Sequence, residues 1–175
     1  MHKKKPEILK CTIRTDVLKH EKPIIGIDPG VSGAFAVINQ DHAVLCDFPK
    51  IKINNKSAIN LPHLKELILQ AADPTISTVY IENVHAMPGQ GVTSMFTFGC
   101  SKGQLEGLCV GLGMDVRFIS PQKWKRYFNL LGESDMAVRN AASQFINVLP
   151  EYSIHALEAL LIAIGGYSTD YESGE

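Results

Sequence analysis

Three acidic residues of this sequence border apolar segments instead of lying among other polar residues. Asp28 and Glu82 each follow a short apolar run rich in β-branched residues, and Glu158 precedes a longer one with helical spacing. A carboxylate at the tip of a buried strand is costly unless a cation or hydrogen-bond donors compensate its charge. Two strand-end acids and a third acid from a helix therefore predict a pocket for hard divalent cations.

The residues after Asp28 indicate what this strand end does not bind. Gly-Ile-Asp-Pro-Gly-Val-Ser-Gly at 26–33 turns directly into a second predicted strand. P-loops and dinucleotide fingerprints need a helix after their glycines, so both are disfavoured. Tight glycines would let a substrate phosphate approach the Asp28 carboxylate. Asp-Pro-Gly is also an ordinary turn, and this segment alone leaves both interpretations open.

A second strand end and a helix supply the other candidate ligands. Glu82 is followed by a polar, glycine-rich loop at 83–91. Because ligands of open α/β sheets gather at the carboxyl ends of strands, Asp28 and Glu82 are expected in one site. Glu158 would join them from a helix that carries His155 three residues earlier on the same face. His155 is either a further ligand or a half-buried polar residue near the helix start.

The periodicity of the chain predicts the elements that hold these residues. It indicates five strands and five helices in the order βββαβαβααα. Only turn signals separate the first three strands, so an antiparallel meander within a mixed α/β sheet is expected. The predicted strands are 24–28, 33–39, 43–48, 78–82 and 115–119, and the predicted helices are 61–72, 92–112, 121–130, 135–148 and 154–165.

Length and charge predict one folded domain with a basic arm. The chain has 175 residues, 45% of them hydrophobic, which suffices for a substantial core. Residues 1–22 hold seven Lys and Arg against three acids and are expected to form a flexible arm, whereas residues 23–175 hold ten against fifteen. The domain is expected at 23–167, with an acidic tail at 168–175. An acidic body must bind a polyanion through a local patch or through the arm.

One basic patch and one glycine repeat stand out from the rest of the domain. Lys-Trp-Lys-Arg-Tyr at 123–127 interleaves aromatic and cationic side chains, as nucleic-acid contacts often require, although a solvated helix with a buried Trp124 has the same letters. Four glycines recur every fourth residue between 99 and 111, each costing helix stability by about 1 kcal/mol relative to alanine. This repeat indicates that another backbone approaches, either the sheet of the same chain or a second helix across a dimer interface.

Two further observations bear on location. No apolar stretch approaches the roughly 18 to 20 residues that span a bilayer, and the first residues lack the apolar core of a secretory signal. The four cysteines, Cys11, Cys46, Cys100 and Cys109, lack the paired spacing of zinc ligands. A cytoplasmic protein with reduced thiols and no membrane partner is expected.

Five short motifs occur together and in order between residues 24 and 166. They are Gly-Ile-Asp-Pro-Gly at 26–30, Ile-Glu-Asn-Val at 81–84, Phe-Gly-Cys-Ser-Lys-Gly at 98–103, Ile-Ser-Pro at 119–121 and Glu-Ala-Leu-Leu-Ile-Ala at 158–163. In this order they resemble the RuvC-type Holliday junction resolvases. The loop Ala-Met-Pro-Gly-Gln-Gly at 86–91 is similar to that of the phage-like branch of this family.

The resemblance implies a ribonuclease H-like α/β fold, in which a mixed five-stranded sheet combines the three-stranded meander with parallel strands and carries helices on both faces. It also implies a homodimeric nuclease that hydrolyses branched DNA with two Mg²⁺ or Mn²⁺ ions per active site. Asp28, Glu82 and Glu158 match three of the family's four metal-binding acids, and His155 stands near the fourth position. The residues that would contact DNA are Lys102, Lys123, Lys125, Arg126, Arg139 and His85.

The sequence departs from the family pattern at three positions. His155 replaces the usual acid, so the resemblance implies a lower metal affinity that is more sensitive to acid pH. Asp135 lies in a loop where similar resolvases usually place a lysine, and its charge would repel phosphate. His85 stands where the bacterial enzymes tend to have an aromatic wedge, which stacks more strongly than histidine.

Other activities remain compatible with the same letters. A ribonuclease H-like nuclease acting on structured RNA would share the strand-end acids. A non-catalytic junction-binding protein would carry departures such as His155 and Asp135. Sugar kinases and actin-like ATPases share the strand that ends at Asp28, but they need two such domains, and this chain has room for one.

Overall fold

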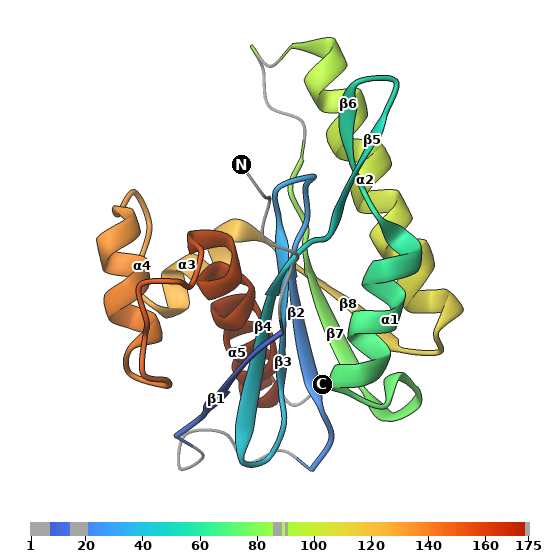
Figure 1. Ribbon diagram of the computed structural model, residues 1–175. Coiled ribbons are helices and arrows are strands. Elements are labelled where there is room, and N and C mark those ends of the chain that lie inside the picture. Colours follow the sequence, from blue (N-terminus) through green and yellow to red (C-terminus); the bar gives the residue numbers. More distant parts are fainter. Residues whose placement is uncertain (1–7, 15–20, 86–88, 90, 174–175) are drawn as a thin grey trace.

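A computed structural model describes residues 8–14, 21–85, 89 and 91–173 and contains a mixed sheet between two layers of helices (Figure 1). The six strands of the sheet lie in the order β1 (Leu9–Thr12), β4 (His42–Asp47), β3 (Ala34–Ile38), β2 (Ile24–Asp28), β7 (Thr78–Glu82) and β8 (Asp115–Ile119). Strands β1, β4, β3 and β2 pair antiparallel in this order. On its other side β2 is parallel to β7, and β7 is parallel to β8. The parallel part therefore brings three carboxyl strand ends to one edge.

The helices divide between the two faces of this sheet. One face carries α5 (Ile154–Ser173), with α3 (Pro121–Tyr127) and α4 (Asp135–Ala142) packed against it. The other face carries α1 (Leu61–Ala71) and α2 (Val92–Gly111), which contact each other. A short 3₁₀ turn at Pro74–Ile76 leads from α1 into β7. The result is three layers with the sheet in the middle.

Alternation along the strands separates the buried side chains into two clusters. In β3, Ala34, Ala36 and Ile38 lie in the cluster with α5, whereas Phe35 and Val37 lie in the cluster with α1 and α2. Successive strand residues point to opposite faces, so a strand buried on both sides reads as a continuous apolar run. The small alanines leave room for α5 to approach the sheet closely.

Gly26 of β2 is the point of closest approach between α5 and the sheet. A Cβ placed on Gly26 would lie 2.0 Å from the carbonyl oxygen of Ala159 and 2.6 Å from the backbone nitrogen of Ala163. Only glycine is compatible with this distance. Asp28 lies two residues further along β2 and therefore on the same face, directly ahead of the start of α5.

All five predicted strands and five predicted helices are present, and the sheet gains β1 as a sixth strand. Residues 1–22 were expected to form a flexible arm, but Leu9–Thr12 pair with β4 and Ile13 is buried. The backbone nitrogen of Arg14 also donates to the carbonyl oxygen of Phe145 at 2.8 Å. Leu9, Cys11 and Ile13 alternate with polar residues, which is an edge-strand pattern that the surrounding charges obscured.

Three helices end at other residues than expected. α3 stops at Tyr127 because Asn129 adopts a left-handed conformation, with φ of 57°. α4 ends at Ala142, short of the expected 148. α5 continues to Ser173, through most of the expected tail at 168–175. Gly165 and Gly166 do not terminate it, because both serve close packing, and a Cβ on Gly166 would lie 2.3 Å from the Tyr80 ring.

A hairpin outside the main sheet was not predicted. It consists of β5 (Lys50–Ile53) and β6 (Lys56–Ile59), which pair antiparallel with each other. It lies between β4 and α1 in the sequence and projects beyond the sheet edge (Figure 1). Among the described residues, every helix is too short or too polar to span a lipid bilayer.

The close approach at Gly26 predicts a large effect of a small substitution. Gly26→Ala should lower the free energy of unfolding by about 3 kcal/mol or more, because the added methyl group meets backbone atoms that cannot rotate away. Chemical denaturation measures this change. Gly91→Ala is the matched control, since its Cβ would come no closer than 3.9 Å to the Ser94 hydroxyl. Equal stability of the two variants would contradict the proposed packing.

Candidate metal centre

Two neighbouring parallel strands bring the strand-end acids together. Ile27 of β2 lies opposite Ile81 of β7, so Asp28 and Glu82 follow at the same edge of the sheet. Glu82 shares a strand face with Tyr80, which packs in the cluster with α5. Both carboxylates therefore belong to the face that α5 and α3 cover, as the sequence predicted for a shared site.

The start of α5 is held at this edge by a capping interaction. The Ser153 hydroxyl accepts a hydrogen bond of 3.0 Å from the backbone nitrogen of Ala156 and donates one to the Asp47 carboxylate at the end of β4. An N-cap of this kind satisfies a free donor of the first helical turn. Because Asp47 belongs to the sheet, the cap also fixes the position of His155 and Glu158 relative to the strand ends.

Asp28, His155 and Glu158 form one compact group. The Nδ1 atom of His155 lies 2.7 Å from Asp28 Oδ2 and 3.8 Å from Glu158 Oε2. One ligand atom from each of the three residues lies within 4.8 Å of the others. Their side chains are 14%, 42% and 22% exposed for Asp28, His155 and Glu158, respectively. The group is thus partly shielded yet open to solvent through His155.

Glu82 lies beside this group and turns its carboxylate toward α3. The indole nitrogen of the fully buried Trp124 donates a hydrogen bond of 2.8 Å to Glu82 Oε1. Glu82 is only 9% exposed, so this donor is its main compensation within the protein. Trp124 therefore orients the acid and is not available for stacking on a base, in agreement with the interpretation of a buried Trp124.

The electrostatics of the site reflect an excess of negative charge. Burial raises the pKa of Glu82 to about 7, and repulsion from Asp28 and Glu158 adds to the effect against the Trp124 hydrogen bond. Burial also raises the pKa of Glu158, with a further contribution from Asp28. The hydrogen bond to Asp28 raises the pKa of His155. Each shift favours proton uptake, which is how a cluster of acids responds when no cation neutralises it.

Lys125 is the cation that the chain itself contributes to this cluster. Its Nζ atom lies 3.8 Å from Glu158 Oε1 and 5.1 Å from the centre of the Trp124 ring. It lowers the pKa of both Glu82 and Glu158. The sequence assigned Lys125 to DNA contact. In the structure its ammonium group lies beside the acids, so it favours their ionised forms.

The remaining residues assigned to DNA contact lie around this edge in different settings. Lys102 donates a hydrogen bond to the Asn83 side chain and lies 5.1 Å from the centre of the Phe118 ring. Arg139 donates to the carbonyl oxygen of Tyr152 at 2.9 Å. His85 is exposed where the described part of the loop ends. Most of the 86–91 loop, at 86–88 and 90, lies outside the described residues.

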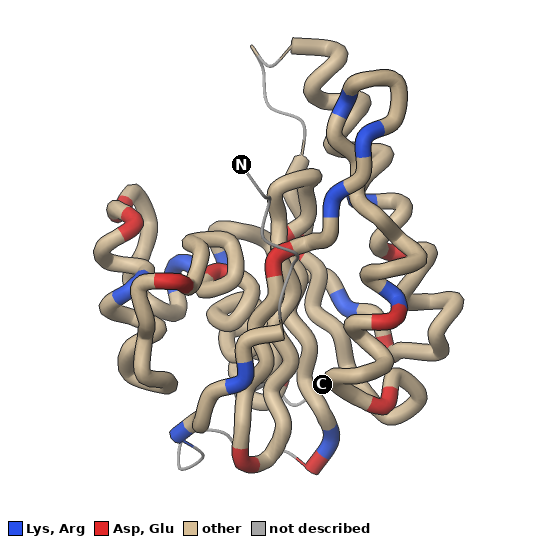
Figure 2. Tube along the Cα trace, in the orientation of Figure 1, with Lys and Arg blue, Asp and Glu red and all other residues tan. Residues whose placement is uncertain are grey.

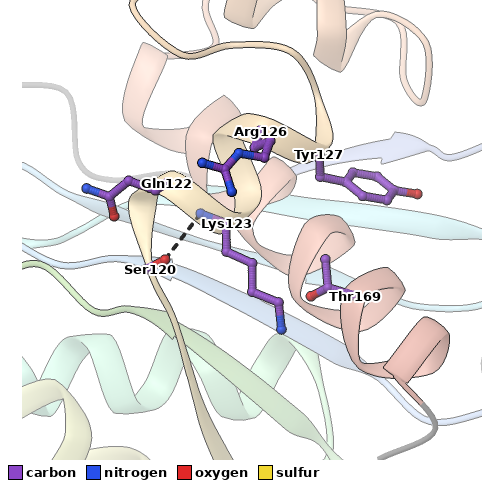
Figure 3. A pocket seen from close by; sticks show the side chains of 6 residues that line it. All are labelled: Ser120, Gln122, Lys123, Arg126, Tyr127 and Thr169. Atoms are coloured by element: carbon purple, nitrogen blue, oxygen red, sulfur yellow. Dashed lines mark hydrogen bonds between the residues drawn. The ribbon is translucent and has the colours of Figure 1, made fainter.

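Lys123 and Arg126 line a shallow hollow of about 320 Å³ beside α3. Figure 3 shows both side chains on the α3 side and Thr169 of α5 across from them. Ser120, Gln122 and Tyr127 complete the lining. The Lys123 Nζ atom lies 3.8 Å from Asp170 Oδ1, so part of its charge is compensated within the chain.

Sequence reasoning missed two residues that position the acids. Trp124 had been interpreted either as part of a nucleic-acid patch or as a buried residue, and no local pattern relates it to Glu82, which is 42 residues away. Asp47 ends β4 as Asp28 ends β2, so the strand-end criterion could have identified it. Its contact with Ser153 joins segments 106 residues apart and depends on the tertiary fold.

The donor set fits a divalent cation. Carboxylate oxygens suit Mg²⁺ and Mn²⁺, and an imidazole nitrogen is compatible with Mn²⁺ and later transition metals. The arrangement therefore forms a possible acidic metal site of Asp28, His155 and Glu158. Glu82 lies close enough to this group for the charges of Asp28 and Glu158 to contribute to its raised pKa.

Comparison with known proteins identifies the fold. No protein-family model matches the chain, and no curated protein matches it in sequence. A structure of Thermus thermophilus RuvC in complex with a Holliday junction substrate is similar, with a TM-score of 0.60 and 15% identity over 88% of this chain and 97% of that chain. A second T. thermophilus RuvC structure gives 0.56 and 14% over 87% and 96%. The RuvC-like, ribonuclease H-like fold predicted from the sequence is confirmed.

The raised pKa of Glu82 predicts a pH-dependent stability in the absence of metal. The folded state holds the proton up to about pH 7, whereas the ordinary pKa is 4.5, so stability falls as pH rises through this window. Glu82→Gln removes the charge and keeps an oxygen for Trp124. It should stabilise the protein at pH 8 by up to about 3 kcal/mol and have little effect near pH 4.

Denaturant unfolding with a chelator present measures this difference at both pH values. Glu66→Gln, at an exposed position of α1, is the matched control for removing one carboxylate. A stability gain of Glu82→Gln that is the same at pH 4 and pH 8 would show that burial of the charge is not its cause.

Proposed function

We propose that this chain is a metal-dependent endonuclease that resolves four-way DNA junctions by paired nicks. The observation that carries the proposal is the group of Asp28, His155 and Glu158 at the carboxyl edge of the sheet. It is supported by the similarity of the whole fold to a RuvC structure with a Holliday junction substrate. A fold can host many functions, so the argument depends on the side chains at this edge.

Each acid has a role that its environment supports. Asp28, Glu82 and Glu158 would hold the divalent ions, with Asp28 at the centre of the group. Divalent ions in such a site lower the pKa of an attacking water and stabilise the leaving oxygen of a phosphodiester. Trp124 fixes the Glu82 carboxylate by a hydrogen bond from α3, and Lys125 limits proton uptake by Glu158.

His155 makes occupancy of this site sensitive to pH. Its Nδ1 atom shares Asp28 Oδ2 with any cation that Asp28 holds. The hydrogen bond to Asp28 raises the pKa of His155, so proton uptake by the ring competes with cation binding at Asp28. In the fourth position it then acts as a neutral ligand or accepts a proton during hydrolysis.

The cations near the site would hold the backbone of the DNA. Arg126 and Lys123 lie together on α3 beside the hollow, whose lining also includes Thr169 in the second half of α5. Lys102 is placed next to Asn83, directly after Glu82. Phosphate contacts fix the register of a nucleic acid without reading its sequence, and they make binding depend on salt.

Asp28→Asn tests the assignment of the catalytic site. The substitution removes the central carboxylate. Mutation of a residue that only supports a metal ligand lowers metal affinity or activity by about 10- to 100-fold, so loss of this carboxylate should lower cleavage by more than about 100-fold. Junction binding should persist, since the phosphate contacts lie elsewhere. Cleavage of a synthetic mobile four-way junction with Mg²⁺ or Mn²⁺, beside linear duplex and structured RNA, measures this.

Asp115→Asn serves as the control, because Asp115 lies at the start of β8, the end of this strand that is far from the metal centre. An Asp28→Asn protein that still cuts well would contradict the metal site. Junction binding without cleavage by the unmodified protein in either metal would instead favour a non-catalytic junction-binding protein. Preferential cleavage of structured RNA would favour the ribonuclease alternative.

An exposed face of α2 supports a homodimer. Among the described residues, a Cβ on Gly99, Gly103, Gly107 or Gly111 would meet nothing within 4 Å, so these glycines do not pack against that part of their own chain. The same helix exposes Val92, Phe96 and Val110, with exposed fractions of 84%, 73% and 60%. Of the two origins that the glycine repeat indicated, packing on the sheet of the same chain is therefore excluded. A second copy of α2 would place two active sites on one junction.

Gly103→Leu tests this interface without disturbing the fold. Within one chain the new side chain would point into open space, so the midpoint of unfolding should change little. In a dimer it would separate two helices that cross at Gly103, so the dimer should dissociate. Analytical ultracentrifugation measures the mass. Gln104→Leu, at the adjacent exposed position, is the control, and a monomeric unmodified protein would contradict the dimer.

A further inference from the structure

The β5–β6 hairpin begins at the same edge of the sheet as the metal centre. It follows β4, whose last residue is Asp47, and the backbone nitrogen of Phe48 donates to the carbonyl oxygen of Gly33. The Lys50 Nζ atom donates to the Ser32 hydroxyl at 3.4 Å, and Ser32 lies four residues after Asp28. The base of the hairpin is thus attached to the loop that follows the central acid.

From this base the hairpin projects into solvent as a two-stranded ribbon. Asn54 and Asn55 both have positive φ, at 48° and 62°, which is the two-residue turn that matches the twist of paired strands. All four residues of β5 are exposed. Figure 1 shows the ribbon extending past the sheet edge, on the side of α1 and α2. An isolated two-stranded ribbon is only marginally stable, so this one gains from a partner.

The ribbon is basic in a domain that is otherwise acidic. It carries Lys50, Lys52 and Lys56, and the sequence has no acidic residue between Asp47 and Glu66. Figure 2 shows Lys and Arg along the hairpin and no Asp or Glu there. Residues 23–175 as a whole hold ten Lys and Arg against fifteen acids. Three of these ten cations therefore lie within seven consecutive residues.

These lysines differ in their contacts from three other cations of the domain. Arg117, Lys123 and Lys125 each lie close to a carboxylate. Within the described part of the chain, no carboxylate forms an ion pair with the three hairpin lysines. Lys50 and Lys52 instead donate to serine hydroxyls, Lys52 to Ser57 at 3.0 Å. Their charges stay available for an anionic partner.

The register places two of these charges in a row. Lys50 and Lys52 are two residues apart, so they share one face of the ribbon, and Lys52 lies opposite Ser57. This row starts beside Ser32, next to the active-site loop, and leads away from the sheet. A phosphate backbone that passes the acids would therefore meet a line of ammonium groups as it leaves the site.

We propose that the β5–β6 hairpin binds the phosphate backbone of a duplex arm of the DNA substrate and directs that arm away from the metal centre. This inference rests on the proposed function, because it presumes a nucleic-acid substrate at the adjacent site. The partner is chosen by charge: an exposed ribbon with lysines and no acids complements a polyanion. The contact is to phosphate, so it supplies affinity and orientation for any sequence.

The opposite face of the ribbon allows a competing occupant. Ile51 and Ile53, which are 44% and 56% exposed, lie on that face together with Ala58. A second copy of the chain could cover these apolar side chains. Lys56 also lies on this face, opposite Ile53, so the charge argument is made for Lys50 and Lys52 on the other face. An experiment that changes only these two lysines separates the two occupants.

The test compares matched pairs of charge-removing variants. Lys50→Gln with Lys52→Gln removes two cations from one face of the hairpin, and Lys10→Gln with Lys65→Gln removes two exposed cations from β1 and α1. Lys50→Arg with Lys52→Arg keeps the charge. Binding of a labelled synthetic four-way junction and of a linear duplex is measured with a chelator over a series of salt concentrations, and sedimentation reports the oligomeric state.

The hairpin variant should bind the junction about tenfold or more weakly near 100 mM salt, and the slope of log affinity against log salt should decrease by about two. The control pair should change affinity by less than about threefold, and the arginine pair should bind like the unmodified protein.

Unchanged binding and slope in the glutamine pair would overturn the hairpin inference and leave the proposed function standing. If the glutamine pair loses binding and the dimer also dissociates, the hairpin inference is overturned, and a second copy of the chain is the occupant of the hairpin. An unmodified protein that binds no DNA would overturn both proposals.

Discussion

The approach of α5 to β2 at Gly26 is the contact on which the candidate site depends. The backbone of α5 comes so near to the strand that a methyl group at Gly26 would overlap the Ala159 carbonyl. This distance sets how far His155 and Glu158 stand from Asp28. A larger residue would lift the helix and separate the three side chains, even if the core tolerated it. Gly26 therefore has a structural role in β2, and through this role it sets the position of Asp28, two residues later, relative to α5.

Holding acids this close stores unfavourable electrostatic energy that the protein only partly offsets. Trp124 donates to Glu82, Lys125 approaches Glu158, and His155 shares its proton with Asp28. These contacts leave the pKa values of Glu82, Glu158 and His155 raised. A bound cation would lower all three together, so affinity for metal and stability of the fold are coupled through the same charges.

The sequence predicted the fold and the shared edge of Asp28 and Glu82 because their signals are local. Each strand that ends in Asp28 or Glu82 is a continuous apolar run, and the parallel register then brings those ends together. The β1 strand was missed because four alternating residues among charges carry little signal. Trp124 and Asp47 were not recognised as positioning residues because their partners, Glu82 and Ser153, are distant in sequence. The roles of the predicted site residues stay predictions, since geometry alone does not test them.

The distribution of charge separates chemistry from binding in this fold. Cations close to the acids, such as Lys125, are compensated by them and tune their ionisation, so they contribute little field at a distance. A chain whose body is acidic must therefore attract a polyanion with cations that stand apart from that cluster. The hairpin meets this requirement because it projects from the sheet edge and contains no acid. Its attachment to the loop after Asp28 keeps those charges near the site without placing them within reach of its carboxylates.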